Sequence, residues 1–292
     1  MFNICCIGHI TLDKVVTPHA TTHMSGGTSS YFSKALQLMD VSYKLVTSLG
    51  QTEMAVVDEL RAGGTDVTAF TSTHSVYFEN SYSGINQDHR TQRVLQKADA
   101  FTIEQLQDVE AEIFHLGPLL ADDLSLEVIK YLAHKGKISL DAQGYLREVR
   151  NYEVYAIDWP QKQEALQYVS ILKANEYELE VLTGETDIKA GALILAGWGV
   201  KEVVITLGSM GSVIYADGVF YNIPAYLPHN VTDATGCGDT YMAGYLYKRV
   251  KGAGIQQAGE FAAAMASIKI AHSGAFIGTE ADVLSFVSAQ EG

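Results

Sequence analysis

Long apolar runs are missing from this chain of 292 residues, although 47% of the residues are hydrophobic. A transmembrane helix needs about 20 consecutive apolar residues, so we expect no membrane partner. Basic residues are also scarce, because 20 Lys and Arg stand against 34 Asp and Glu, a formal net charge of −14. A chain this acidic is poorly suited to bind nucleic acid or an anionic membrane surface.

Cysteine is also rare in the sequence. Only Cys5, Cys6 and Cys237 occur, without the spacing of a zinc site, and the nine histidines are scattered. We therefore expect reduced, buried cysteines that act as small hydrophobic residues in a cytoplasmic protein. Residues 1–8 lack a basic segment and a cleavage site, which favours a first strand over a signal peptide.

Several functional motifs are missing as well. No Walker A motif occurs, so a P-loop mechanism is unsupported. The first predicted strand is not followed by Gly-x-Gly-x-x-Gly, which argues against an NAD-dependent oxidoreductase. No internal repeat or Pro/Ser-rich linker divides the sequence, so we expect a single domain over residues 1–292.

Apolar strands and amphipathic helices alternate along most of the chain, for example at residues 170–174 and 176–182. This alternation predicts an α/β fold, in which helices cover both faces of a mainly parallel sheet. Between about residues 65 and 102 a period of two replaces the helical period, so we expect a small antiparallel sheet there, joined by residues 10–23. A β patch of this kind on an α/β body suggests a lid.

A glycine-rich loop leads into a predicted helix at Gly236, Cys237 and Gly238. Glycines let the backbone approach a ligand closely, and the N-terminus of a helix attracts anions. Asp239 follows at once in the first turn. A carboxylate beside an anion site makes sense if it takes a proton from a hydroxyl group that attacks a bound phosphoryl group. The structural alternative is a capped helix start with an acidic first turn.

The string Asp233-Ala-Thr-Gly-Cys-Gly-Asp239 resembles the C-terminal signature of the PfkB (ribokinase-like) carbohydrate and nucleoside kinases, and the resemblance extends from Gly8 to about Gly274. It implies a three-layer α/β/α ribokinase-like body with a small β-sheet lid. It also implies a kinase that uses ATP and Mg²⁺. In that family the final aspartate of the string is the general base, and the amides of residues 236–238 form an anion hole.

Two further segments match the family in order along the chain. Asn175 and Glu178 resemble its Asn-x-x-Glu element, which holds Mg²⁺ through ordered water, although the same spacing fits a helix capping box. Thr206, Gly208 and Gly211 resemble its nucleotide-binding loop, and by themselves they also fit a tight turn between strands.

Asp13, Gly26 and Gly27 resemble the residues with which the family binds its acceptor. A carboxylate accepts hydrogen bonds from a diol, and paired glycines admit a ring against the backbone. The chain departs from the family at His9 and Tyr31, where Asn is usual and where side chains would line the acceptor pocket. Ribose recognition is therefore not carried over.

Few basic residues lie near these segments: Lys14 and Lys34 do, whereas Arg90 and Arg147 fit surface ion pairs better than ligand contacts. A sugar phosphate would need more basic groups, so we expect an uncharged sugar, polyol or nucleoside. The hypothesis is an ATP-dependent kinase that phosphorylates a hydroxyl group of a small sugar or polyol. The alternatives are a nucleoside kinase of the same family and a non-catalytic sugar- or nucleotide-sensing protein on this fold. The exposed edge of a β lid also favours a homodimer.

Overall fold

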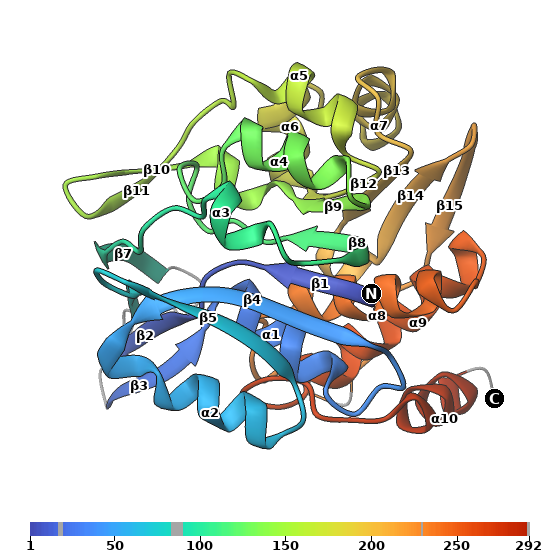
Figure 1. Ribbon diagram of the computed structural model, residues 1–292. Helices are drawn as coiled ribbons and strands as arrows, with labels where there is room; N and C mark the ends of the chain where they lie inside the picture. Colours follow the sequence, from blue (N-terminus) through green and yellow to red (C-terminus); the bar gives the residue numbers. More distant parts are fainter. Residues whose placement is uncertain (17–19, 83–89, 229, 291–292) are drawn as a thin grey trace.

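The computed structural model describes residues 1–16, 20–82, 90–228 and 230–290, and two sheets organise it (Figure 1). The larger sheet has nine strands in the order β15-β14-β13-β12-β9-β8-β1-β4-β5. Along the chain these strands are β1 (Phe2–Ile7), β4 (Tyr43–Gly50), β5 (Asp66–Ser72), β8 (Ala111–Leu116), β9 (Lys137–Asp141), β12 (Ile171–Asn175), β13 (Glu202–Thr206), β14 (Ser212–Ala216) and β15 (Val219–Ile223).

The larger sheet is mainly parallel, as the sequence predicted. Neighbouring strands from β5 across to β13 are parallel, and β14 and β15 add an antiparallel hairpin at the edge. Parallel strands are buried on both faces, which explains their continuous apolar runs. Val203 and Val204, adjacent on β13, are both fully buried. Cys5 and Cys6, adjacent on β1, pack into the two opposite cores.

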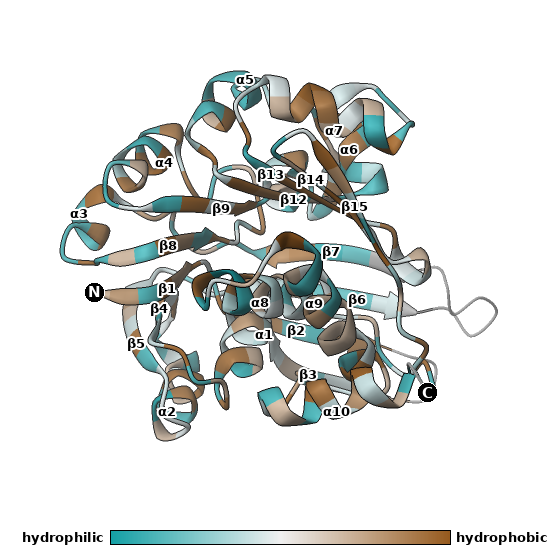
Figure 2. Cartoon of the chain, turned by 90° about the vertical axis from the view of Figure 1, so that its right-hand side faces the viewer, coloured by the Kyte–Doolittle hydropathy of each residue, from teal (hydrophilic) through white to brown (hydrophobic). Residues whose placement is uncertain are grey.

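Helices cover both faces of the larger sheet and close one hydrophobic core on each (Figure 1). One layer contains α1 (Gly27–Leu36), α2 (Ala55–Ala62), α8 (Cys237–Val250), α9 (Ile255–Ile270) and α10 (Glu280–Gln290). The other contains α3 (Ile103–Leu106), α4 (Leu126–Ala133), α5 (Lys162–Ala165), α6 (Glu176–Thr183) and α7 (Ile188–Gly197). The expected three-layer α/β/α fold is confirmed, and Figure 2 shows that strands β12–β14 are largely hydrophobic. Within the described ranges, no helix has the length and apolar content to cross a membrane.

The smaller sheet has six strands in the order β10-β11-β7-β6-β2-β3. They are β2 (Thr11–Val16), β3 (Thr21–Gly26), β6 (Val76–Tyr82), β7 (Arg90–Gln96), β10 (Arg147–Arg150) and β11 (Glu153–Ala156). A second sheet was predicted from residues 10–23 and 65–102, and most of its strands come from those ranges. Residues 83–89, inside the second range, lie outside the described residues.

Three strands differ from that prediction. The first, β5, was expected in the smaller sheet but pairs in parallel with β4, so that Val67 lies opposite Leu45 in the larger sheet. Its alternating pattern comes from its place at the sheet edge, where one face packs on the core and the other is more open.

The hairpin of β10 and β11 joins the smaller sheet, which the sequence did not predict. It pairs with β7 at Glu153 and Arg93. Its turn residues Asn151 and Tyr152 have φ angles of 51° and 68°, and a two-residue hairpin turn needs positive φ at both positions. Tyrosine is an unusual residue at the second turn position, so the turn signal was weak.

Candidate active site

A cavity of about 1310 Å³ collects backbone and side chains from both sheets. The carboxyl ends of parallel strands share one edge of the sheet, which is why segments far apart in sequence meet here. The predicted site residues that line the cavity are Asp13, Gly27, Tyr31, Asn175, Thr206, Gly208, Gly211, Gly236, Cys237, Gly238 and Asp239. His9, Gly26 and Glu178 do not belong to this lining.

Helix α8 begins at the cavity, at a turn that only glycine fits. Gly236 is its N-cap residue with φ of 77°, in the left-handed region that favours glycine. A Cβ atom on Gly236 would lie 2.2 Å from Cδ1 of Tyr31, so the Tyr31 ring packs directly on this turn. The first amides of a helix lack partners within it. The Cys237 amide donates to the Ala234 carbonyl at 3.2 Å, so a bound anion would compete for it.

Asp239 lines the cavity from the first turn of α8. Burial raises the pKa of Asp239 to about 6, and the negative charge of Asp141 adds to the rise. Lys173, the Thr28 hydroxyl and Arg147 oppose it. A carboxylate with this pKa is mostly ionised at neutral pH and is a better proton acceptor than an ordinary aspartate.

A buried ion pair beside the start of α8 was missed by the sequence analysis. Nζ of Lys173 lies 2.9 Å from Oδ2 of Asp141, and the two side chains are 7% and 6% exposed. Nζ also lies 3.9 Å from Oε2 of Glu178. A Cβ atom on Gly238 would lie 3.3 Å from the Lys173 ammonium, so the positive charge faces the glycine-rich loop. The available signal was a lysine between the apolar residues Leu172 and Ala174 of strand β12.

Asn175 and Glu178 form a complete capping box at the start of α6. Oδ1 of Asn175 accepts from the Glu178 amide, and Oε2 of Glu178 accepts from the Asn175 amide, both at 2.8 Å. Oε1 of Glu178 accepts a long hydrogen bond of 3.4 Å from Nε2 of Gln143. In the described part of the chain, no group of three His, Cys, Asp or Glu residues could hold a metal directly. These donors fit an Mg²⁺ ion that keeps its waters and binds mainly through substrate phosphates.

The two adjacent glycines make room for neighbouring groups at the side of the cavity where the sequence predicts the acceptor. A Cβ atom on Gly26 would lie 2.2 Å from Oδ2 of Asp13. Oδ1 of Asp13 accepts from the Thr11 hydroxyl at 2.7 Å. Gly27 has φ of 82°, and a Cβ atom there would lie 2.7 Å from the His9 carbonyl oxygen. The glycines thus bring the Asp13 carboxylate to the cavity, and Gly26 itself stays behind it.

The wall beside Asp13, where the sequence predicts the acceptor, is mostly polar and comes largely from the smaller sheet and its connections. Nε2 of Gln92 donates to Oδ1 of Asn80 at 3.0 Å. Arg147, expected on the surface, lines the cavity, whereas the Arg90 side chain lies outside the described set. The lining residues of this wall beyond those predicted are Thr28, Phe78, Asn80, Gln92, Leu119, Asp141, Gln143 and Arg147.

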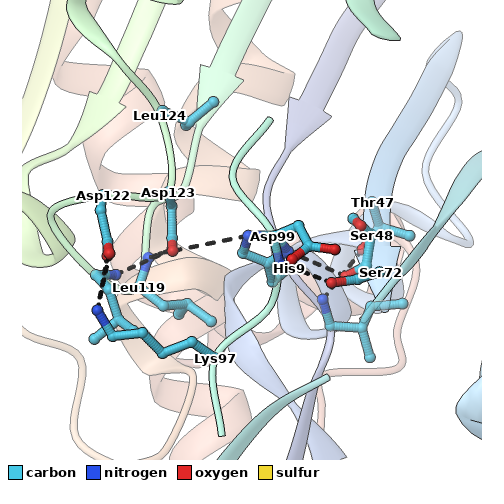
Figure 3. Close-up of polar contacts among 12 residues, drawn as sticks. His9, Thr47, Ser48, Ser72, Lys97, Asp99, Leu119, Asp122, Asp123 and Leu124 are labelled. Carbon is cyan, nitrogen blue, oxygen red and sulfur yellow. Dashed lines mark hydrogen bonds and ion pairs between the residues drawn. The ribbon is translucent and has the colours of Figure 1, made fainter. Parts of the chain in front are cut away.

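His9 is fully buried and does not line the cavity. Figure 3 shows its side chain between Asp123 and Ser48. Its Nδ1 is 3.0 Å from the Ser48 carbonyl oxygen, and its Nε2 is 3.8 Å from Oδ1 of Asp123. The ring stacks on Phe101 at 4.6 Å. Oδ2 of Asp123 accepts from the amide of Leu119 at 2.7 Å, and Leu119 lines the cavity. His9 therefore supports the wall that contains Leu119 from behind.

The turn after β13 forms the opposite part of the cavity. Gly208 and Gly211 have φ angles of 56° and 89°, and the Leu207 amide donates to the Gly211 carbonyl at 2.8 Å. A Cβ atom on Gly211 would lie 2.1 Å from the Ile223 carbonyl oxygen and 2.8 Å from the amide of Ala225. The cavity wall that includes Ala225 is largely apolar, with Ala225, Tyr226, Pro228, Val231, Ala263, Ala266 and Ile270, and Ser267 is a polar member of it.

Comparison with known proteins agrees with this geometry. The model of the pfkB family carbohydrate kinases matches residues 1–282. The chain belongs to the PfkB family. The resemblance drawn from residues 233–239 is thereby confirmed, and this PfkB-family protein is a phosphotransferase that acts on a hydroxyl group.

Individual relatives of this PfkB-family kinase differ in what they act on. A cytidine kinase of Thermococcus kodakarensis is 28% identical over 258 residues, which cover 84% of this chain and 88% of the relative. A pyrophosphate-dependent kinase in the ribokinase family, solved with a pyrophosphate analog and myo-inositol, is 29% identical with a TM-score of 0.85, covering 97% and 99% of the two chains. Ribokinase of Arabidopsis thaliana with ribose and ATP shares the fold, at 21% identity and a TM-score of 0.83 over 98% of each chain.

Proposed function

We propose that this PfkB-family protein is an ATP-dependent kinase that phosphorylates a hydroxyl group of a small sugar or polyol. One observation carries the proposal. Asp239, with a pKa raised to about 6, lies at the N-terminus of α8 in the same cavity as the predicted nucleotide and acceptor residues. Phosphoryl transfer to a hydroxyl group requires such a base next to an anion-binding site.

In the proposed step, Asp239 takes the proton of the acceptor hydroxyl while its oxygen bonds to the γ-phosphorus of ATP. The bond from that phosphorus to the β–γ bridging oxygen breaks, and ADP leaves with the electron pair. The amides of Gly236, Cys237 and Gly238 bind the oxygens of the transferred group, and the ammonium of Lys173 adds positive charge beside Gly238. Donors fixed in place before the reaction stabilise the charge that develops during transfer.

Asn175 and Glu178 are the proposed metal-associated residues. Asn175 lines the cavity, and the carboxylate of Glu178 is held behind it by the capping box. They would orient Mg²⁺ through water, and the bound ion neutralises charge on the donor phosphates. Because the capping box fixes both side chains, these oxygens keep their positions when phosphates enter.

The apolar wall favours ATP over pyrophosphate as the donor. Thr206, Gly208 and Gly211 border the proposed nucleotide, and the alanines of α9 with Ile270 continue this part of the cavity. An apolar surface of this kind suits a nucleoside and offers nothing to an inorganic donor. The similarity to a pyrophosphate-dependent kinase makes pyrophosphate the donor to compare.

The acceptor wall favours a polyhydroxylated molecule over a nucleoside. Asp13, Asn80, Gln92 and Gln143 present carboxylate or carboxamide groups, which pair well with hydroxyl groups. Among the residues of this wall that the sequence did not predict, Phe78 is the single aromatic residue. A nucleobase would prefer a broader flat apolar surface. The myo-inositol complex of a relative agrees with the polyol, and the relative named a cytidine kinase supports the nucleoside alternative.

A phosphorylation assay across acceptors and donors tests the proposal. Sugars, cyclic polyols and nucleosides are each incubated with MgATP, with ADP as the product measured, and with Mg-pyrophosphate, with orthophosphate measured. We expect ADP formation with a sugar or polyol and little turnover with pyrophosphate. Turnover with nucleosides alone would establish the nucleoside alternative. Binding of ATP or a sugar without turnover of any acceptor would establish the sensing alternative.

A further inference from the structure

Lys269, in the last turn of α9, is a charged residue that the proposed reaction does not use. Its side chain has an exposed fraction of 0%. Nζ donates to the backbone carbonyl oxygen of Asp233 at 2.7 Å and to Oδ2 of the same residue at 3.1 Å. A buried ammonium is unfavourable unless oxygens compensate for the lost water, and here one residue provides two of them.

Asp233 opens the loop that ends in the anion-binding turn. Its Oδ1 accepts from the Thr235 amide at 2.9 Å, and its own amide donates to the Ile270 carbonyl at 3.2 Å. Its Oδ2 also has a longer contact, at 3.4 Å, with the amide of Gly274. The Lys269 ammonium therefore holds Asp233 in place. Because the loop to Gly236 starts at Asp233, this contact helps to fix the position of the loop.

The same ammonium also approaches the aromatic ring that packs on this turn. Nζ of Lys269 lies 5.8 Å from the centre of the Tyr31 ring, within the range of a cation–π interaction. The Tyr31 ring is in turn the group that a Cβ atom on Gly236 would meet at 2.2 Å. Lys269 therefore contacts Asp233 in the loop before Gly236, and it also lies near the Tyr31 ring that packs on Gly236.

The charges around Lys269 are consistent with a tight local pair. Burial raises the pKa of Asp233, but hydrogen bonds from Thr235 and the charge of Lys269 outweigh it, so the pKa of Asp233 lies below its usual range. Burial raises the pKa of Cys237 to about 11, so the neighbouring thiol is neutral. The positive charge of Lys269 and the negative charge of Asp233 then neutralise each other, and no further ion is needed for charge balance.

We propose that Lys269 is a built-in cation that positions the phosphate-binding loop 233–238, so that the protein needs no monovalent metal ion at this place. The carbonyl and carboxylate oxygens of Asp233, which bind the Lys269 ammonium, are groups that can also coordinate K⁺. A tethered ammonium provides the charge already in position, which avoids the entropy cost of capturing an ion. Lys269 is a positioning residue, because it acts through the loop amides. Its kinetic readout rests on the proposed kinase function.

The test compares three lysine variants in different salts. K269A opens the ammonium position, K269M fills it with an uncharged chain, and K251A removes a lysine from an exposed ion pair with Asp40 as a control. Turnover is measured in KCl, methylammonium chloride and choline chloride at equal ionic strength. We expect the unaltered protein and K251A to show the same turnover in every salt.

For K269A we expect a loss of about 10²-fold in kcat in choline chloride, comparable to loss of one anion-hole donor. In KCl or methylammonium chloride, the kcat of K269A should be at least about tenfold higher than in choline chloride. K269M should lose as much and recover nothing, because the side chain fills the position. Turnover of the unaltered protein that requires K⁺ overturns the proposal, as does K269A with unchanged turnover.

Thermal unfolding provides a readout that does not depend on catalysis. The melting temperature of K269A should rise with KCl relative to choline chloride, because an ion that binds the folded state stabilises it. The unaltered protein and K269M should show no such difference. If no acceptor is phosphorylated, the kinase proposal fails while this comparison still decides the role of Lys269. Equal melting temperatures of K269A in both salts overturn the built-in cation. If K269A does not fold, K⁺-dependent melting of the unaltered protein is the overturning result.

Discussion

At the scale of single residues, the charges around Asp239 set the pH range of the proposed reaction. The carboxylate form accepts the proton, and burial with Asp141 nearby raises the pKa of Asp239 to about 6. The plot of kcat/KM against pH should therefore fall on the acid side with an apparent pKa of about 6, by about one decade per pH unit. In D141N a charge that raises this pKa is removed, so the acid limb should move to lower pH.

D58N is the matched control for this pH profile, and K173M is a variant for which the opposite shift is expected. Asp58 is an exposed surface carboxylate, and its replacement should leave the profile where it was. Lys173 lowers the pKa of Asp239, so K173M should move the acid limb to higher pH and also reduce kcat. A profile that stays in place in both D141N and K173M contradicts the assigned charge balance.

His9 provides a second prediction at this scale. In H9Q the contact to Asp123 and the stacking on Phe101 are lost, which loosens the segment that presents Leu119 to the cavity. We expect the KM for the acceptor to rise by about tenfold with little change in the KM for ATP, because a positioning effect on one wall affects one substrate. Equal changes in both KM values would indicate a general structural defect instead.

At the scale of elements, the start of α8 depends on one glycine. G236A places a Cβ atom 2.2 Å from the Tyr31 ring at a φ of 77°. We expect a loss of about 2–4 kcal/mol in the free energy of unfolding, from backbone strain and overpacking together, and a large loss of turnover. Denaturant unfolding measures the first and the ADP assay the second.

Gly184, at the end of α6, offers a matched control for this glycine. Its φ is 78°, and a Cβ atom there would meet nothing within 4 Å. G184A should therefore lose only about 1 kcal/mol from backbone strain. If G184A and G236A lose the same stability, the packing of Tyr31 on the turn contributes nothing.

Elements were predictable where a local pattern determines them. The capping box at Asn175 and Glu178 was legible in the sequence and is present in full. The hairpin at Asn151 and Tyr152 was not, because its turn lacks the usual glycine. Strand β5 was placed in the wrong sheet because an alternating pattern indicates a half-buried strand but not the strand with which it pairs.

At the scale of the whole molecule, the mainly parallel sheet with helices on both faces followed from strand–helix alternation, whereas the arrangement of the site depended on pairing between distant segments. Lys173 and Asp141 belong to different strands and become partners only when β9 and β12 lie side by side. His9 was expected to line the cavity, yet the stacking of Phe101 and the position of Asp123 place it behind the wall. Sequence spacing carries no information about such contacts between distant segments.

The assembly of the molecule remains a prediction at this scale. The edge strands of the smaller sheet are β3 and β10, and the unpaired edge of a sheet can pair with a second copy. We expect a homodimer through this sheet, detected as twice the chain mass in light scattering after size exclusion. A monomeric mass at all concentrations would contradict it.

The central claim is that Asp239 is the general base of a kinase, and turnover of D239N tests it most directly. Asparagine keeps the shape of the side chain but cannot accept the proton. With the best acceptor at saturating MgATP, we predict that kcat falls by a factor on the order of 10²–10⁴ while ATP binding, measured by calorimetry, stays unchanged. Near-normal turnover of D239N would contradict the account.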